Sequence, residues 1–429
     1  MMKDPTRTDI HRALARHDGV MLEIMGRVRR DFLPGDWRSL GIHPSERALH
    51  GERFGDLAEV WFHATEPAIG GYSQVEGLSV VKDPDATFFL RDAIAECGRE
   101  ILGEEYHKKH GRLAMFTKIY SYTVNIFLHW HLNQVLAGQV HQMSKEEGYY
   151  FAPELFPYGQ HPFTYFALKP DTTKERVRAA LSRKSWDSCD TSLLDQCHKI
   201  ELKPGTGWIL GSLLIHGPGA APTIEPQVMA DNLIVGIPQL ANGTPVTRDL
   251  LFRDLTERFR ENVDLIVDET LDWTGNCVSE EEWVQSHYLE PIPVNGEARP
   301  GVQDRWVVYG NFSRTFPNQS FSTKELRLKP GAETVLYDHG FTGAFVLAGA
   351  GVIVSDGCPD VHVSALPPFW RETALHTYSN AVTWTADRAK RGVHIKNIHT
   401  SQDLVMIRSI AGGTKYMPEV GAHRAASPN

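Results

Sequence analysis

Apolar positions change their spacing several times along the chain, which divides it into regions of different secondary structure. Between Gly55 and about Ile237, short apolar runs are separated by glycine and proline, a pattern typical of strands joined by tight turns. A second strand-rich region extends from Val302 to Ile410, with apolar runs at 306–309, 344–347, 352–354 and 404–410. The pattern therefore predicts two β-rich units separated by a segment of a different kind.

Helical spacing of apolar residues marks the segments outside these units. The start of the chain, up to about Phe32, is predicted to form one or two amphipathic helices from Ile10, Leu14, Val20, Ile24 and Val28. The segment from Val246 to about Trp273 is predicted to be helical, with one apolar face made by Leu251, Leu255, Phe259, Val263 and Ile266. Helices therefore precede the first β-rich unit and separate it from the second.

Three shorter helices are predicted from local signals. One covers Ala86–Leu102. Another begins at Thr172, because Thr172 and Glu175 have the spacing of a capping box, and a third begins at Ser279, with Glu282 three residues on. These helices decorate a fold that we expect to be mainly β.

Composition narrows the class of protein. The 429 residues can bury two substantial cores, and 41% apolar with 23% charged residues is ordinary for a folded protein. A formal net charge of -9 argues against a general nucleic-acid binder, since phosphate backbones need basic surface. The five scattered cysteines, the absence of an apolar leader and the absence of a long apolar run predict a soluble, cytoplasmic protein with reduced thiols and no membrane partner.

Two histidine motifs suggest a metal site inside the first β-rich unit. In the segment 202–219 a Pro-Gly turn, an apolar strand and a second turn lead to His216, eleven residues after Gly205. Upstream, His129 and His131 stand two apart, so that on a strand both imidazoles project from one face. Neutral imidazoles suit Zn²⁺ and Fe²⁺. His141, in a Gln-Val-His run, remains an alternative to His131, and a buried histidine held by a backbone carbonyl is the alternative to any ligand.

The same stretches resemble, in the same order, segments of the type I mannose-6-phosphate isomerases of the cupin superfamily. Residues 55–61 look like the Gly-Glu-Val-Trp strand of that family, and residues 113–131 resemble its next conserved segment, with Lys118 at the lysine and His131 at the metal histidine. The other matching stretches are 165–181, 204–216, which places His216 at the second metal histidine, and Glu225–Gln227.

The resemblance implies a domain organisation. It implies a mainly β protein of two cupin (jelly-roll) β-barrels with a helical insert between them. The expected parts are an N-terminal helical extension (1–54), a first cupin barrel with the metal site (55–240), the helical insert (241–294), a second barrel without metal (295–413) and a flexible tail (414–429). In the second barrel, His376 and Asn380 near Asp338 leave a second site as a minor alternative.

The resemblance also implies a site. It assigns His131 and His216 to a divalent metal, most simply Zn²⁺, with Fe²⁺ or Mn²⁺ as alternatives, and it places Lys118, His129 and Gln227 beside the substrate. The Lys-x-Glu that supplies an acidic ligand in the family is expected just before Phe163, where there is no acid, so Glu154 or His161 is the expected substitute. The arginine of the family is also missing after Gln227, and Arg248 or Arg253 is the expected replacement.

The function that follows from the resemblance is a metal-dependent aldose–ketose isomerase acting on a sugar or sugar phosphate. The departures keep two other functions open: an iron-dependent cupin oxygenase and a sugar-binding cupin without catalysis. The small-molecule partner is the sugar itself, and a homodimer is left open.

Overall fold

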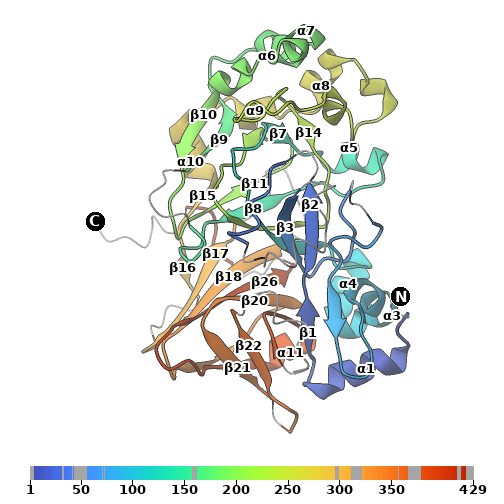
Figure 1. The fold of residues 1–429 in the computed structure, drawn as a ribbon, viewed down its shortest axis with the longest axis vertical. Coiled ribbons are helices and arrows are strands. Elements are labelled where there is room, and N and C mark those ends of the chain that lie inside the picture. Colours follow the sequence, from blue (N-terminus) through green and yellow to red (C-terminus); the bar gives the residue numbers. More distant parts are fainter. Residues whose placement is uncertain are drawn as a thin grey trace.

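A computed structural model describes residues 4–30, 33–40, 42, 56–69, 71, 73–156, 162–294, 299–310, 321–355, 357–365, 378–412 and 417–421. Within these ranges the chain is mainly β and forms four sheets. Figure 1 shows the sheets as successive layers along the long axis of the molecule. All strand pairs are antiparallel except β22 (Val361–Ser364) with β23 (Tyr378–Ser379).

The first two sheets face each other at one end of the molecule. Their facing side chains form a core that includes Trp208 and Tyr149 from one sheet and Phe166 from the other, with the Phe166 and Trp208 ring centroids 4.9 Å apart. The seven-stranded sheet has the order β15 (Tyr288–Leu289), β11 (Gly207–Leu210), β8 (Glu147–Tyr150), β13 (Thr223–Val228), β6 (Met115–Tyr120), β3 (Asp56–Phe62), β2 (Gly26–Arg30). The five-stranded sheet has the order β10 (Cys197–Glu201), β9 (Phe163–Leu168), β12 (His216–Gly217), β7 (His129–Trp130), β14 (Ile234–Val235).

The other two sheets form a second pair. Leu326, Trp384 and Met406 of one sheet pack against Ile353 and Ile395 of the other. The nine-stranded sheet has the order β16 (Ile292–Pro293), β17 (Val302–Val308), β18 (Phe321–Leu328), β26 (Leu404–Ala411), β20 (Thr342–Ala348), β24 (Ala381–Trp384), β1 (Val20–Ile24), β4 (Val80–Lys82), β5 (Phe88–Phe89). The last sheet has the order β19 (Glu333–Leu336), β25 (Val393–Asn397), β21 (Ala350–Val354), β22, β23.

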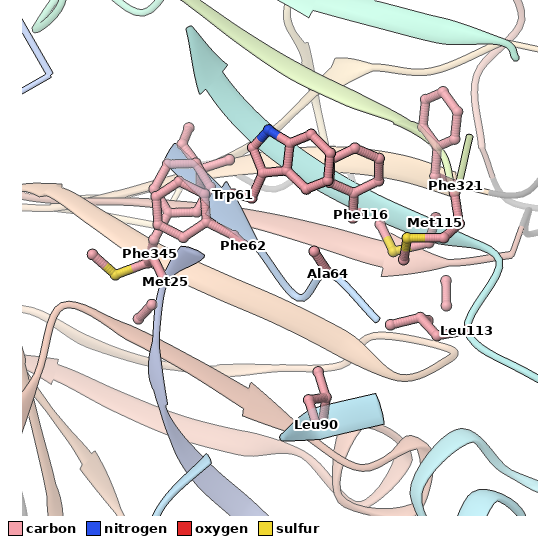
Figure 2. Packing of buried hydrophobic residues seen from close by; sticks show 14 of the residues in the cluster. Met25, Trp61, Phe62, Ala64, Leu90, Leu113, Met115, Phe116, Phe321 and Phe345 are labelled. Atoms are coloured by element: carbon pink, nitrogen blue, oxygen red, sulfur yellow. The ribbon is translucent and has the colours of Figure 1, made fainter. Parts of the chain in front are cut away.

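The two pairs are joined in the middle, where the seven-stranded sheet packs against the nine-stranded sheet. Phe62 of β3 stacks on Phe345 of β20 with ring centroids 4.0 Å apart, and Met115 and Phe321 belong to the same buried cluster. Figure 2 shows these side chains together with Trp61 and Phe116, which belong to the same buried cluster. Burial of so many large apolar side chains stabilises the junction, since each is worth roughly 1.5–3 kcal/mol.

Helices cover the ends and one flank of the layers. Those beyond the first five-stranded sheet, at the top of Figure 1, are α5 (Gln134–Gln139), α6 (Lys174–Leu181), α7 (Arg183–Asp187), α8 (Val263–Glu269) and α9 (Trp273–Asn276). The remaining α-helices are α1 (Arg7–Arg16), α3 (Leu90–Leu102), α4 (Glu104–His110), α10 (Glu280–His287) and α11 (Ala386–Arg391), and the 3-10 turns are η2 (Ser192–Gln196), η3 (Arg248–Leu251) and η4 (Glu257–Phe259). Every helix of the described ranges is too short or too polar to span a lipid bilayer.

Several sequence predictions are confirmed and two are wrong. The strands of the second β-rich region and the capping box at Ser279 are present. The helix predicted over Ala86–Leu102 ends at Leu102 as expected but begins at Leu90, because Phe88–Phe89 pairs as strand β5. The helix predicted from Thr172 begins one residue later, with Thr173 as its N-cap. The N-terminal segment is not helical throughout, because Val20–Ile24 pairs with β24 and β4 as a strand.

The long helix predicted from Val246 is the second error. Two 3-10 turns precede α8, so the helical spacing of its apolar residues reports their packing into one core rather than a continuous helix. Of the predicted flexible tail, only 417–421 lie within the described residues, and there Met417 and Val420 pack against the junction core.

Candidate metal centre

Strand alternation sends a row of charged side chains from the seven-stranded sheet toward the first five-stranded sheet. Phe62 and Thr117 project the other way, toward the nine-stranded sheet, where they meet Phe345 and Ser409. Successive side chains of a strand alternate between its two faces. Residues an odd number of positions from Phe62 or Thr117 along the same strand therefore project toward the five-stranded sheet. This face carries one charged residue on each of four adjacent strands: Glu59 on β3, Lys118 on β6, Glu225 on β13 and Glu147 on β8.

Three imidazoles from the five-stranded sheet meet this row. His216 on β12 lies directly opposite His129 on β7, and His131 follows two residues after His129. The ring centroids of His129 and His216 are 4.2 Å apart, and His131 lies 5.0 Å from each. All three side chains are buried, and one potential ligand atom from each lies within 4.8 Å of the others.

Backbone carbonyls fix the orientation of all three rings. Nδ1 of His129 lies 3.2 Å from the carbonyl oxygen of Phe127, Nδ1 of His131 lies 2.7 Å from that of Asn232, and Nδ1 of His216 lies 2.9 Å from that of Leu214. A carbonyl can only accept, so each Nδ1 carries a proton, and in the neutral ring each Nε2 keeps a lone pair. This is the arrangement that supports histidine as a metal ligand.

The turn before His216 also has an uncommon backbone. Leu213 has a φ of 61°, in the left-handed region that favours glycine, and its N–H donates to the carbonyl of His131 over 2.8 Å. This hydrogen bond connects the two histidine-bearing segments. The local strain at Leu213 is therefore linked to the placement of both rings.

A carboxylate completes the group. One oxygen of Glu147 lies 3.1 Å from Nε2 of His131 and the other lies 3.1 Å from Nε2 of His216. The Lys145 ammonium is 2.7 Å from the same carboxylate and 3.1 Å from Nε2 of His131, and the Tyr149 hydroxyl donates to Glu147. Burial alone would raise the pKa of Glu147, but Lys145 and the two imidazoles hold it well below its usual range.

The donor set fits a divalent metal ion. Nε2 of His216 is fully buried, makes no hydrogen bond and lies 3.1 Å from Oε1 of Glu147. Two buried acceptor atoms that face each other at this distance are costly, and a cation held between them would satisfy both. His129, His131, His216 and Glu147 would supply three nitrogen ligands and one oxygen ligand, a set suited to Zn²⁺, Fe²⁺ or Mn²⁺.

The protonation states agree with this assignment. Burial, followed by the nearby Lys145 charge, lowers the pKa of His131 to about 3. Burial and the neighbouring imidazoles lower the pKa of His129 well below its usual range. Both rings are therefore neutral near pH 7, which is the form that binds a metal.

The charged row continues away from the imidazoles. Lys118 lies 3.0 Å from Glu225, and Lys145 lies 3.7 Å from the same oxygen. Burial, followed by the charge of Glu147, raises the pKa of Glu225 to about 8. Burial alone would lower the pKa of Lys118, but Glu225 and Glu59 raise it above its usual value. A carboxyl that can gain or lose a proton near neutral pH therefore stands beside a permanent cation.

The sequence-predicted residues divide into two groups. His129, His131, His216 and Lys118 lie in or next to the group, whereas His141 is not part of it. Gln227 lies opposite Glu147 in the sheet register, and its side chain donates to the carbonyls of Val228 and Ala230.

The expected replacement residues lie elsewhere. Glu154 is held by Arg327, 2.7 Å away. Arg248 pairs with Glu261 in the helical region. Arg253 donates to the Asp231 carbonyl and to Asp254. His161 lies outside the described residues, and so does His376.

Glu147 and Lys145 are functional candidates that the sequence patterns did not single out. A signal for them exists, because Lys145-Glu146-Glu147 has the Lys-x-Glu spacing of the resembled family and is followed by two tyrosines. The predicted position of this motif, just before Phe163, is one strand too late in the chain, where an aromatic pair also occurs. The β8 pairing with β11 and β13 puts Glu147 on the inner face, and no local pattern announces that pairing.

Comparisons with known proteins give a structural likeness only. No family model and no curated protein matches the chain. Mannose 6-phosphate isomerase from Bacillus subtilis is 15% identical, with a TM-score of 0.60 over 91% of this chain and 99% of its own. A variant of phosphomannose isomerase from Salmonella typhimurium is 12% identical, with a TM-score of 0.60 over 92% and 99%. A zinc-bound mannose 6-phosphate isomerase is 12% identical, with a TM-score of 0.58 over the same shares. The chain therefore has the fold of the mannose-6-phosphate isomerases, with a strongly diverged sequence.

Proposed function

We propose that this protein is a metal-dependent aldose–ketose isomerase that acts on a sugar or sugar phosphate. The observation that carries the proposal is the convergence of three carbonyl-oriented imidazoles and the Glu147 carboxylate in one buried group. The solved structures with this fold are described as mannose-6-phosphate isomerases, one of them zinc-bound, and this supports assigning the same class of reaction here.

The proposal also assigns a role to each of the two sheet pairs. We take the first sheet pair as the metal-binding cupin barrel, the helices around α8 as its insert and the second sheet pair as a barrel without metal. The metal ligands on both sheets of the first pair, and none between the sheets of the second among the described residues, support this division.

The residues around the group suit the chemistry of isomerisation. An aldose and a ketose differ by a proton moved between C1 and C2 through an enediol. A bound metal would stabilise the charge that develops on the substrate oxygens. Lys118 and Lys145 add fixed positive charge beside it. Glu225 holds or releases a proton at its carboxyl oxygen near neutral pH, which is the property required of a general base.

Metal analysis and a substrate screen test the proposal. The purified protein should contain about one divalent ion per chain and should interconvert at least one aldose with its ketose. The Glu225→Gln variant should keep the metal and lose at least about 100-fold in kcat, because the carboxyl that moves the proton is gone. A metal-loaded protein without isomerase activity on any aldose or aldose phosphate would contradict the proposal.

The donor set itself favours one competing function. Three imidazoles and one carboxylate also suit Fe²⁺ in oxygen chemistry. Oxygen consumption by the iron-loaded protein, without isomerisation of any sugar, would replace the isomerase by an oxygenase.

A further inference from the structure

Two buried asparagines are hydrogen-bonded to the chain segments that carry the candidate metal ligands. Asn232 lies two residues before β14, and Asn276 is the last residue of α9. Both residues are 0% exposed. A buried side-chain amide needs partners for its oxygen and for its N–H groups, because unpaired polar groups are costly in the interior. Both asparagines find these partners in the backbone of the ligand-bearing segments.

The Asn232 side chain bridges the segment of His131 and the segment that leads to Glu147. Its Oδ1 accepts from the Leu132 N–H over 2.9 Å, and its Nδ2 donates to the Met143 carbonyl over 2.9 Å. Its own backbone carbonyl accepts from Nδ1 of His131 over 2.7 Å. Asn232 therefore fixes the orientation of the His131 ring and also its separation from the chain that enters β8.

The Asn276 side chain holds the turn before His216 in the same way. Its Nδ2 donates to the Leu213 carbonyl over 2.8 Å, and its Oδ1 accepts from the Ile215 N–H over 2.7 Å. These two bonds lie on either side of Leu214, whose carbonyl accepts from Nδ1 of His216 over 2.9 Å. Because Leu213 has a φ of 61°, the two bonds hold a strained turn together with the carbonyl that orients the His216 ring.

Strand pairing gives these segments little support of its own. The strands β7 and β12, which carry two of the histidines, are each two residues long. The backbone groups that the asparagines bind belong to Leu132, Met143, Leu213 and Ile215, which all lie outside the strands and need other partners. We infer that these two asparagines are positioning residues that set the spacing and orientation of the metal ligands before an ion binds; this inference rests on the metal-dependent function proposed above.

A third asparagine provides a matched control in the second sheet pair. Asn397 of β25 is also 0% exposed. Its Nδ2 donates to the carbonyls of Leu328 and Gln402 over 2.8 and 2.9 Å, and its Oδ1 accepts from the His399 N–H over 2.8 Å. It therefore makes bonds of the same kind and number without contact with a metal ligand. Its removal reports the effect of losing a buried amide on stability alone.

Metal titration of the metal-free, full-length protein tests the inference. Asn232→Ala and Asn276→Ala should each lower the Zn²⁺ affinity, measured by calorimetry, at least about 10-fold. Each should also change the visible absorption spectrum of bound Co²⁺, which reports the geometry of the ligands around the ion. Asn397→Ala should keep the wild-type affinity and spectrum. Chemical denaturation should show a similar loss of stability in all three metal-free variants, because each loses the same number of buried hydrogen bonds.

The possible outcomes separate the inference from the proposed function. Wild-type Zn²⁺ affinity and Co²⁺ spectrum in the folded Asn232→Ala and Asn276→Ala proteins would overturn the inference and leave the isomerase function standing. An equal fall in affinity in all three variants would also overturn it, because the fall would then follow from lost stability. A wild-type protein that binds neither ion would remove the proposed function and the inference together. If an alanine variant fails to fold, the serine variant at the same position, which keeps one polar group, replaces it.

Discussion

The two sheet pairs bury charge in different ways. Between the sheets of the second pair, Lys324 lies 2.8 Å from Asp338, and Arg408 lies 2.7 Å from Asp304 and 3.5 Å from Asp338. Between the sheets of the first pair, ion pairs of the same kind are joined by three imidazoles whose Nε2 atoms face one another and Glu147. Both interiors carry the cost of desolvated charge, but among the residues that the structure describes only the first also holds lone pairs aimed at one point.

This difference shows which buried polar groups point to function. A cation beside a carboxylate compensates its neighbour, and such a pair specifies packing rather than chemistry. Three imidazoles fixed by backbone carbonyls, with two Nε2 atoms meeting one carboxylate, are not explained by such pairing. The group of His129, His131 and His216 is therefore the feature that distinguishes two otherwise similar sheet pairs.

Among the changes considered, removal of one imidazole should have the largest effect on the difference between the two sheet pairs. His216→Ala deletes one ligand, so metal affinity should fall at least about 100-fold and isomerase activity should disappear with it. Elemental analysis after dialysis and calorimetric Zn²⁺ titration would measure the loss. His394→Ala is the matched control, because this histidine lies near Glu333 on the outer part of the second pair and is 38% exposed. Full metal content in the His216→Ala protein would show that the convergent group is not the metal site.

The converse change removes a buried acid from the second pair. Asp338→Asn leaves Lys324 and Arg408 without their shared carboxylate, so the free energy of unfolding should fall by roughly 3 kcal/mol. Chemical denaturation would measure it. The metal content of the variant should stay at the wild-type level. A loss of metal in this variant would show that the second interior affects the metal centre, so that the two interiors do not have separate roles.

Most of the fold and about half of the site follow from the sequence, and the division has a physical origin. Strand runs such as Leu404–Ile410 and the His129–His131 spacing are local patterns, so the order of residues along the chain is enough to predict them. Glu147 could not be chosen over Glu154 in that way, because the choice depends on which strands pair with β8. The strand at Val20–Ile24 escapes prediction for the same reason: its partners β24 and β4 lie about 360 and 60 residues away.

As the pH falls, the stabilising contributions of the two interiors should be lost in different pH ranges. The folded pKa of His131 is about 3, below the unfolded value near 6.5, so the unfolded chain binds more protons between these values. The metal-free protein should therefore lose stability as pH falls below about 6.5, on the order of 2 kcal/mol between pH 7 and pH 5. Arg408 and Lys324 lower the pKa of Asp338 against the effect of burial, so its contribution is present above about pH 4 and lost only below it.

Denaturant titrations of three metal-free proteins would check this order. The wild type and Asp338→Asn should show the same loss between pH 7 and pH 5, because Asp338 is ionised throughout that range. His131→Gln should show a smaller loss, because it lacks one of the groups that must be protonated on unfolding. An identical pH dependence in all three proteins would show that the buried imidazoles do not set the acid sensitivity of the first pair.

The smallest expected effect comes from Glu154, which connects the two pairs without belonging to either interior. Its carboxylate is about 20% exposed and is held by Arg327 of β18, which also bonds to Glu325. Glu154→Gln should lower the free energy of unfolding by about 1 kcal/mol or less, since a partly exposed ion pair is weak and Arg327 keeps its second partner. Its Zn²⁺ affinity should change less than about twofold, whereas Glu147→Gln, the same change on β8, should lower it at least about 10-fold. Glu154 lies away from the face where the imidazoles converge. Equal losses of affinity in the two variants would therefore show that the strand pairing of β8 does not decide which glutamate is the acidic metal ligand.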